Sequence, residues 1–151
     1  MSSKSLFVAV DRQEMLARLG RLSATAKPQW GKMDAAQMCA HCQVGMQVAL
    51  GELELKRGLL GILFGGFARR QLLSGKPWGR NLPTAPEFRV TEPRDFARER
   101  AALADLVRRF GEGGPSSLTQ KPHPFFGQLS ADEWSTLQWR HLDHHFRQFG
   151  V

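Results

Sequence analysis

Apolar side chains recur at the three- and four-residue spacing of an amphipathic helix in four stretches of the chain. Three of these stretches open with a polar pair spaced as in a capping box, where the first side chain caps the helix and the second reaches back to it. The pairs are Asp11 with Glu14, Asp34 with Gln37, and Ser130 with Glu133. The remaining helix is predicted to start near Thr91 and Pro93 and to end at Gly111. The pattern therefore predicts an all-α protein.

The connection between the second and third predicted helices, which begins at Gly51, is the longest in the chain. It runs for roughly 40 residues, which is too long for a simple loop in a helical bundle. We expect it to contain a short extra helix around Leu59–Leu73, followed by the turn-rich segment 74–87. No internal repeat interrupts the pattern. The prediction is a single domain over residues 1–151, a four-helix bundle with a long crossover between helices 2 and 3.

The composition agrees with this architecture, because 42% hydrophobic and 23% charged residues are ordinary for a globular protein. The only cysteines, Cys39 and Cys42, are too close together to join distant segments, which indicates a reducing compartment. The start of the chain is not apolar enough for a signal peptide. The longest apolar stretch, Gly58–Ala68, is much shorter than the about 20 residues that span a bilayer. We therefore expect a cytoplasmic protein without a transmembrane segment.

The net charge of +7 is concentrated in the long connection, since no acidic residue occurs between Lys56 and Pro86. The basic residues of this segment are Lys56, Arg57, Arg69, Arg70, Lys76 and Arg80. Such a segment can bind an anionic membrane, an acidic partner or nucleic acid, or it can simply keep the protein in solution. Nucleic acid is the least favoured of these, because no nucleic-acid-binding fold signature accompanies the charge.

The last predicted helix carries the strongest sign of chemistry. His141 and His145 are four residues apart, so their Cβ atoms lie about 6 Å apart on one face, and the two rings can bind one metal ion. His144, about 100° from each of its neighbours in sequence, points away from the ion and is expected to support the site from the rim or to lie at the surface. His41, in the apolar row of the second predicted helix, is the candidate third ligand. The alternative is that His41 is a core histidine with a satisfied hydrogen bond.

Several neighbours could support such a site. Gln138, one turn before His141, could fix the tautomer of an imidazole, or it could be an ordinary interior amide. Cys42 follows His41 and could reach the rim of a metal pocket, although a buried, inert thiol is the simpler expectation. His123 stands between two prolines, so its backbone is extended, and it could cap the mouth of a pocket.

Three familiar classes of site do not fit the sequence. A zincin protease needs the glutamate of H-E-x-x-H, and Asp143 lies on the opposite side of the helix from His141. A thioredoxin-type Cys-x-x-Cys needs a helix N-terminus beneath it, whereas Cys39 and Cys42 fall inside a predicted helix. A structural zinc finger needs more than this one cysteine pair.

Four segments carry a resemblance to a known family. In order along the chain they read GKMDAAQMCAHC, LSGKPWGRNLPT, HPFFGQLSADEW and HLDHHFRQFG. A histidine in the second helix followed by H-x-x-x-H in the last resembles the DinB/YfiT-like superfamily of metal-dependent enzymes. More narrowly, nearly the whole chain resembles the family catalogued as domain of unknown function 1569.

The resemblance implies a four-helix bundle in which His41, His141 and His145 hold a divalent ion, with nickel, zinc, iron and manganese all candidates. It also implies, in many members, a homodimer. Characterised members of the superfamily include transferases and isomerases that use low-molecular-weight thiols, so a small-molecule substrate is expected, with such a thiol as a candidate. The leading hypothesis is therefore a metal-dependent transferase or hydrolase in which the ion activates water or a thiol. The alternative is a binding protein whose basic segment 56–80, with Trp78, docks on an anionic membrane or partner while the histidines are structural.

Overall fold

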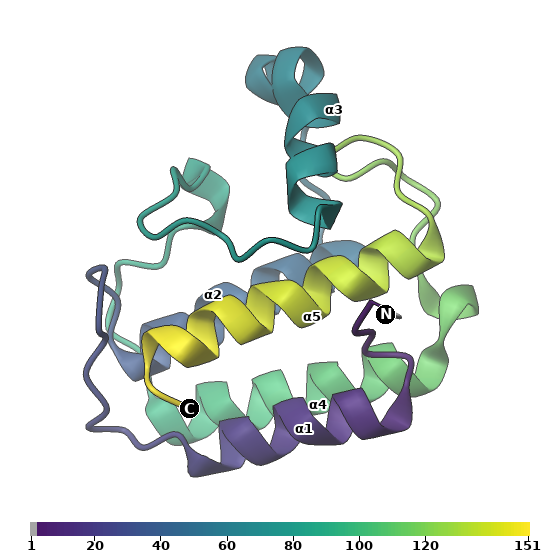
Figure 1. Ribbon diagram of the computed structural model, residues 1–151. Coiled ribbons are helices and arrows are strands. Elements are labelled where there is room, and N and C mark those ends of the chain that lie inside the picture. Colours follow the sequence, from purple (N-terminus) through teal and green to yellow (C-terminus); the bar gives the residue numbers. More distant parts are fainter. Residues whose placement is uncertain (1–2) are drawn as a thin grey trace.

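The computed structural model describes residues 3–151, and in this part of the chain the regular secondary structure is all helical, with no β-strand (Figure 1). It contains five α-helices and two short 3₁₀ turns. The α-helices are α1 Ala9–Arg21, α2 Ala35–Ala49, α3 Leu59–Leu73, α4 Phe96–Gly113 and α5 Ala131–Gln148, and the 3₁₀ turns are η1 Pro86–Phe88 and η2 Pro115–Ser117. The predicted all-α class is thus confirmed.

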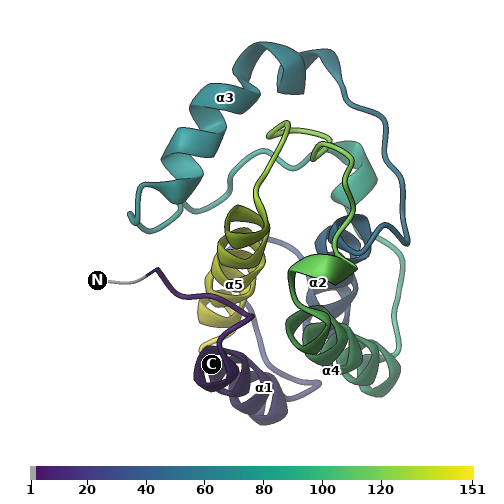
Figure 2. The same ribbon diagram turned by 90° about the vertical axis from the view of Figure 1, so that its right-hand side faces the viewer.

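Helices α1, α2, α4 and α5 lie side by side and enclose the core, whereas α3 stands apart from them (Figure 2). The core between the four helices is largely apolar, and Phe110, Trp134 and Phe146 within it are at most 1% exposed. Burying an aromatic side chain of this kind stabilises the fold by about 1.5–3 kcal/mol. Helix α2 is buried on most of its surface, so the side chain of His41 faces the interior of the protein.

Two of the predicted capping boxes are present. At the start of α2, the backbone N–H of Gln37 donates to the Asp34 carboxylate at 2.8 Å, and the side chain of Gln37 accepts from the Asp34 N–H at 3.0 Å. At the start of α5, Ser130 and Glu133 form the same reciprocal pair at 3.2 and 2.8 Å. These boxes fix where the two histidine-bearing helices begin, and hence the height of each histidine along the bundle.

The predicted starts of the other two helices were wrong. Helix α1 begins at Ala9 without a side-chain cap, because the Asp11 carboxylate instead accepts from the Ser5 N–H at 3.1 Å and pairs with Lys4 at 2.7 Å. Helix α4 begins at Phe96 rather than near Thr91, because the Asp95 side chain caps it by accepting from the Arg98 N–H at 2.8 Å.

Helix α3 has the predicted bounds, but its orientation could not be read from its pattern. Gly61 and Gly65 face the turn that precedes α5, and a Cβ at Gly65 would lie 2.2 Å from the carbonyl oxygen of Phe125. The close approach requires glycine at this position. Arg69 forms an ion pair with Glu133 at the start of α5. Most of the large apolar side chains of α3 therefore point away from the core, whereas Leu72 near its end is buried in it.

No helix within residues 3–151 has both the length and the apolar character needed to span a membrane.

Candidate metal centre

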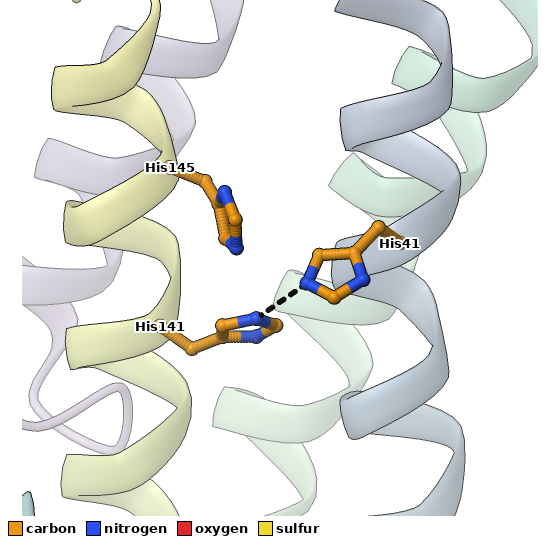
Figure 3. A group of neighbouring side chains, drawn as sticks. All are labelled: His41, His141 and His145. Carbon is orange, nitrogen blue, oxygen red and sulfur yellow. Dashed lines mark hydrogen bonds between the residues drawn. The ribbon is translucent and has the colours of Figure 1, made fainter. Parts of the chain in front are cut away.

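Three histidines from two helices converge in the interior between α2 and α5 (Figure 3). His141 and His145 occupy successive turns of α5, and His41 faces them from α2. The Nε2 atoms of His41 and His141 are 3.0 Å apart, and one ring nitrogen from each of the three residues lies within 4.8 Å of the others. The structure therefore brings together the three residues that the sequence analysis gives as candidate metal ligands.

A backbone acceptor orients the ring of His41. Its Nδ1–H donates to the carbonyl oxygen of Phe88 at 2.7 Å, so in the neutral ring the lone pair is on Nε2, the nitrogen that faces the other two histidines. Phe88 is the last residue of the turn η1, in the long connection between α2 and α4. The connection thus contributes directly to the geometry of the site.

A side-chain relay orients the ring of His145. Its Nδ1 lies 2.8 Å from Oε1 of Gln148, while Nε2 of Gln148 donates to the carbonyl oxygen of Trp30 at 2.6 Å. The second bond fixes which end of the amide faces the imidazole, so Nδ1 of His145 carries the proton. The lone pair of His145 is then on Nε2 as well.

Burial keeps the rings neutral. Desolvation lowers the pKa of His41 below 6.5, lowers that of His145 to about 3, and, together with the neighbouring His145 and His41, lowers the pKa of His141 well below 6.5. A neutral imidazole is the form that binds metals. Metal binding at pH 7 would therefore displace no proton from His145.

The donor set fits a divalent transition metal. Metal–nitrogen bonds of about 2.0–2.1 Å in tetrahedral geometry place two ligand nitrogens about 3.3 Å apart. The 3.0 Å separation between His41 and His141 is close to this value, and two bare lone pairs at such a distance repel unless a proton or a cation lies between them. Three imidazoles leave coordination positions for water or substrate, which is typical of catalytic rather than structural sites.

The other two histidines lie outside this group. His144 is half-buried, with its ring 5.6 Å from Trp30 and 5.8 Å from Trp78. His123 is 5% exposed, and its Nδ1 accepts from the backbone N–H groups of Phe125 and Phe126 at 3.0 and 3.2 Å. Instead of facing a pocket, His123 stabilises the turn on which α3 rests, and burial lowers its pKa to about 4.

The two supporting residues expected next to the ligands have other surroundings. Gln138 is buried against Gly45, and its Oε1 makes no hydrogen bond within the described residues. The thiol of Cys42 is fully buried and directed at the sulfur of Met38 at 3.7 Å, and burial raises its pKa well above 9. A thiol in this environment is unreactive.

The groups that do orient the rings were missed at the sequence level. Gln148 lies three residues after His145 in the same inward row, so the spacing of a helix could have identified it. The carbonyl oxygen of Phe88 carries no signal in the sequence, because any residue supplies a backbone acceptor there. Trp78, which the sequence pattern places only in the basic docking segment, lies against His141 with its ring 6.1 Å away.

Fold and site together describe an all-helical protein with a largely buried three-histidine group that can hold a metal ion. The chain belongs to the family described as protein of unknown function DUF1569, which it matches over residues 2–150. Neither the curated proteins nor the solved structures contain a match to this chain.

Proposed function

We propose that the protein is a metal-dependent enzyme in which His41, His141 and His145 hold one divalent ion. The observation that carries the proposal is the pair of hydrogen bonds at Nδ1 of His41 and Nδ1 of His145. Because Phe88 and Gln148 occupy Nδ1 of His41 and His145, both lone pairs face the centre of the group. Partners of this kind are usual around metal-bound histidines.

The proposal includes the finer fold, a DinB/YfiT-like four-helix bundle of α1, α2, α4 and α5 with α3 in the crossover. The side-by-side packing of these four helices supports it. The ion, with nickel, zinc, iron and manganese as candidates, would polarise a water molecule or a thiol at its open positions. The substrate would be a small molecule, with a low-molecular-weight thiol as a candidate partner, in a transfer or hydrolysis reaction.

Metal content tests the proposal directly. Untagged protein, purified without chelators and then supplied with each candidate metal, is expected to hold about one ion per chain by plasma mass spectrometry. The variants His41→Ala and His145→Ala should lose the ion. His144→Ala is the matched control, because it removes a neighbouring imidazole that lies outside the group. Wild-type protein that takes up no ion, or equal loss in the control, would refute the proposal.

A second candidate function is docking on an anionic membrane, and the outer face of α3 favours it. Six large apolar side chains of α3 are between 56 and 71% exposed, a density rarely left open on a protein surface. They are Leu59, Leu60, Ile62, Leu63, Phe64 and Phe67. The glycine face of the helix is held against the turn at Phe125, so the apolar face cannot rotate inward.

The positive charge around this face favours binding to an anionic membrane over binding to a second copy of the chain. Lys56 and Arg57 precede α3, Arg70 lies on it, and no acidic residue occurs from Lys56 to Pro86 to compensate them. Two such faces would repel each other, whereas anionic lipid attracts each basic residue by about 1 kcal/mol. Apolar insertion and charge would then act together.

Vesicle co-sedimentation tests this second function. Binding to vesicles containing phosphatidylserine should fall steeply with added salt and should be lost in the double variant Leu63→Ser, Phe67→Ser. Val10→Ser is the control, because Val10 is equally exposed on α1. No binding at low salt refutes docking. Concentration-dependent dimers that the double variant abolishes would instead give the face to a homodimer.

A further inference from the structure

A pocket of about 740 Å³ is lined by residues of α5, of the connection that follows α3 and of the connection between α1 and α2. Its size is in the range that takes a small molecule, roughly 300–1,000 Å³. Three of the four tryptophans of the chain line it, together with three arginines. These residues are Trp30, Trp78, Trp139, Arg80, Arg140 and Arg147. Such a lining offers flat apolar surfaces and an excess of positive charge.

The charge of the pocket is not neutralised from within. Among residues 3–151, Asp143 is the only acidic residue that lines it, and this carboxylate already pairs with Arg18 at 2.7 Å and Arg147 at 3.0 Å. Arg80 and Arg140 have no carboxylate within 4 Å in the described part of the chain. Two guanidinium groups at the pocket are therefore available to an anion.

Tryptophan rings hold these two guanidinium groups in place. Arg80 lies over the ring of Trp30 at 4.5 Å, and Arg140 lies near the ring of Trp78 at 5.8 Å while it also donates to the carbonyl oxygen of Lys76. Stacked arginines lose less conformational freedom when an anion binds. Their planar donor pairs match the oxygens of a carboxylate or a phosphate.

The side chain of His144 separates the pocket from His145 of the three-histidine group. His144 lines the pocket, and the ring of His144 is 5.1 Å from that of His145. Trp78 lies between the pocket and His141, with ring distances of 5.8 Å to His144 and 6.1 Å to His141. A molecule bound here would thus lie against the residues that cover the candidate metal centre.

We propose that this pocket binds a small-molecule anion, with Arg80 and Arg140 holding a carboxylate or phosphate group and the indole rings holding a flat apolar part. The identification of this anion as the substrate rests on the metal-dependent function proposed above. The binding site itself does not, because none of its anion contacts belongs to the three-histidine group.

Tryptophan fluorescence gives the test, because three of the four emitting residues line the pocket. Benzoate and phenyl phosphate, titrated separately at fixed ionic strength, should each change the emission of the full-length protein saturably, and the tighter of the two identifies the preferred anion. Neutral benzamide is the matched probe, and it should bind at least tenfold more weakly. Equal responses to benzamide and to both anions, or no saturable response to either anion, would overturn the proposal.

Variants locate the binding to the two arginines. Arg80→Gln and Arg140→Gln should each weaken anion binding at least tenfold, and Arg140→Lys should restore part of the loss. Arg108→Gln, which removes the same charge from the exposed side of α4, should leave binding unchanged. Anion affinity that falls equally in Arg108→Gln and Arg140→Gln would reduce the effect to net charge and refute the site.

A further arm separates this inference from the proposed enzyme. Anion binding is expected to persist in His41→Ala, whether or not that variant retains metal. Metal uptake without anion binding would refute only the proposal that the pocket binds an anion. Anion binding to wild-type protein that takes up no metal overturns the metal-dependent function alone.

Discussion

Acid should destabilise the protein through its buried histidines, and His123 allows the effect of one group to be isolated. This residue is 5% exposed, its ring lies tilted against those of Phe126 and Trp134, and its Nδ1 accepts from two backbone N–H groups. Protonation would place a proton on the nitrogen that those donors occupy and would bury a charge. The folded state therefore disfavours the imidazolium form.

The sign and size follow from proton linkage. The pKa of His123 is about 4 in the folded protein and about 6.5 when unfolded, so below pH 6.5 the unfolded chain binds the proton more readily. The stabilising contribution is complete above pH 6.5 and is lost as the pH falls toward 4. Between pH 7 and pH 5 this residue alone lowers the free energy of unfolding by about 2 kcal/mol.

The variant His123→Asn removes the titration while its side-chain oxygen can still accept from the backbone N–H groups of Phe125 and Phe126. Urea unfolding of chelator-treated protein at pH 7, 6 and 5 gives the free energy of unfolding of each form. The variant is expected to be less stable at pH 7, because it loses packing, but its stability should fall by about 2 kcal/mol less between pH 7 and pH 5. Parallel pH profiles for the two proteins would refute the assignment.

Three further outcomes are expected. Gln148→Leu should lower metal affinity about 10- to 100-fold in a competition titration, because His145 loses the acceptor on Nδ1; an unchanged affinity would contradict the role of the relay. Gly66→Ala, with nothing within 4 Å of the new Cβ, should raise the free energy of unfolding by up to about 1 kcal/mol, whereas Gly65→Ala should lower it; urea unfolding compares the two. Ser130→Ala should cost about 1 kcal/mol in the same assay, since the N–H of Glu133 loses its acceptor.

Local signals in the sequence predicted much of the fold. The pairs Asp34 with Gln37 and Ser130 with Glu133 are complete within four residues, so a capping box could be recognised without knowledge of the rest of the chain. Asp11 has the same spacing to Glu14, but Lys4 and the N–H of Ser5 compete for its carboxylate. A helix start can therefore be predicted only where no neighbouring segment offers the capping side chain a better partner.

The candidate site, too, could be predicted from the sequence only where local spacing determines it. The i, i+4 spacing put His141 and His145 on one face of a helix, and the apolar row of α2 placed His41 inside. The acceptor for His41 comes from η1, 47 residues further along the chain, and such a contact depends on how the long connection folds back. The pocket beside the histidines depends equally on tertiary structure, because Trp30 and Trp78 come from two separate connections.

The hydrogen-bond partners that orient His41 and His145 differ in how readily a mutation can remove them. The partner of His41 is a main-chain oxygen, which every amino acid at position 88 would provide as long as η1 keeps its shape. The partner of His145 is the amide of Gln148, and most single substitutions there would abolish it. During evolution, a single substitution at position 148 can therefore release the ring of His145. The orientation of His41 changes only when the long connection between α2 and α4 folds differently.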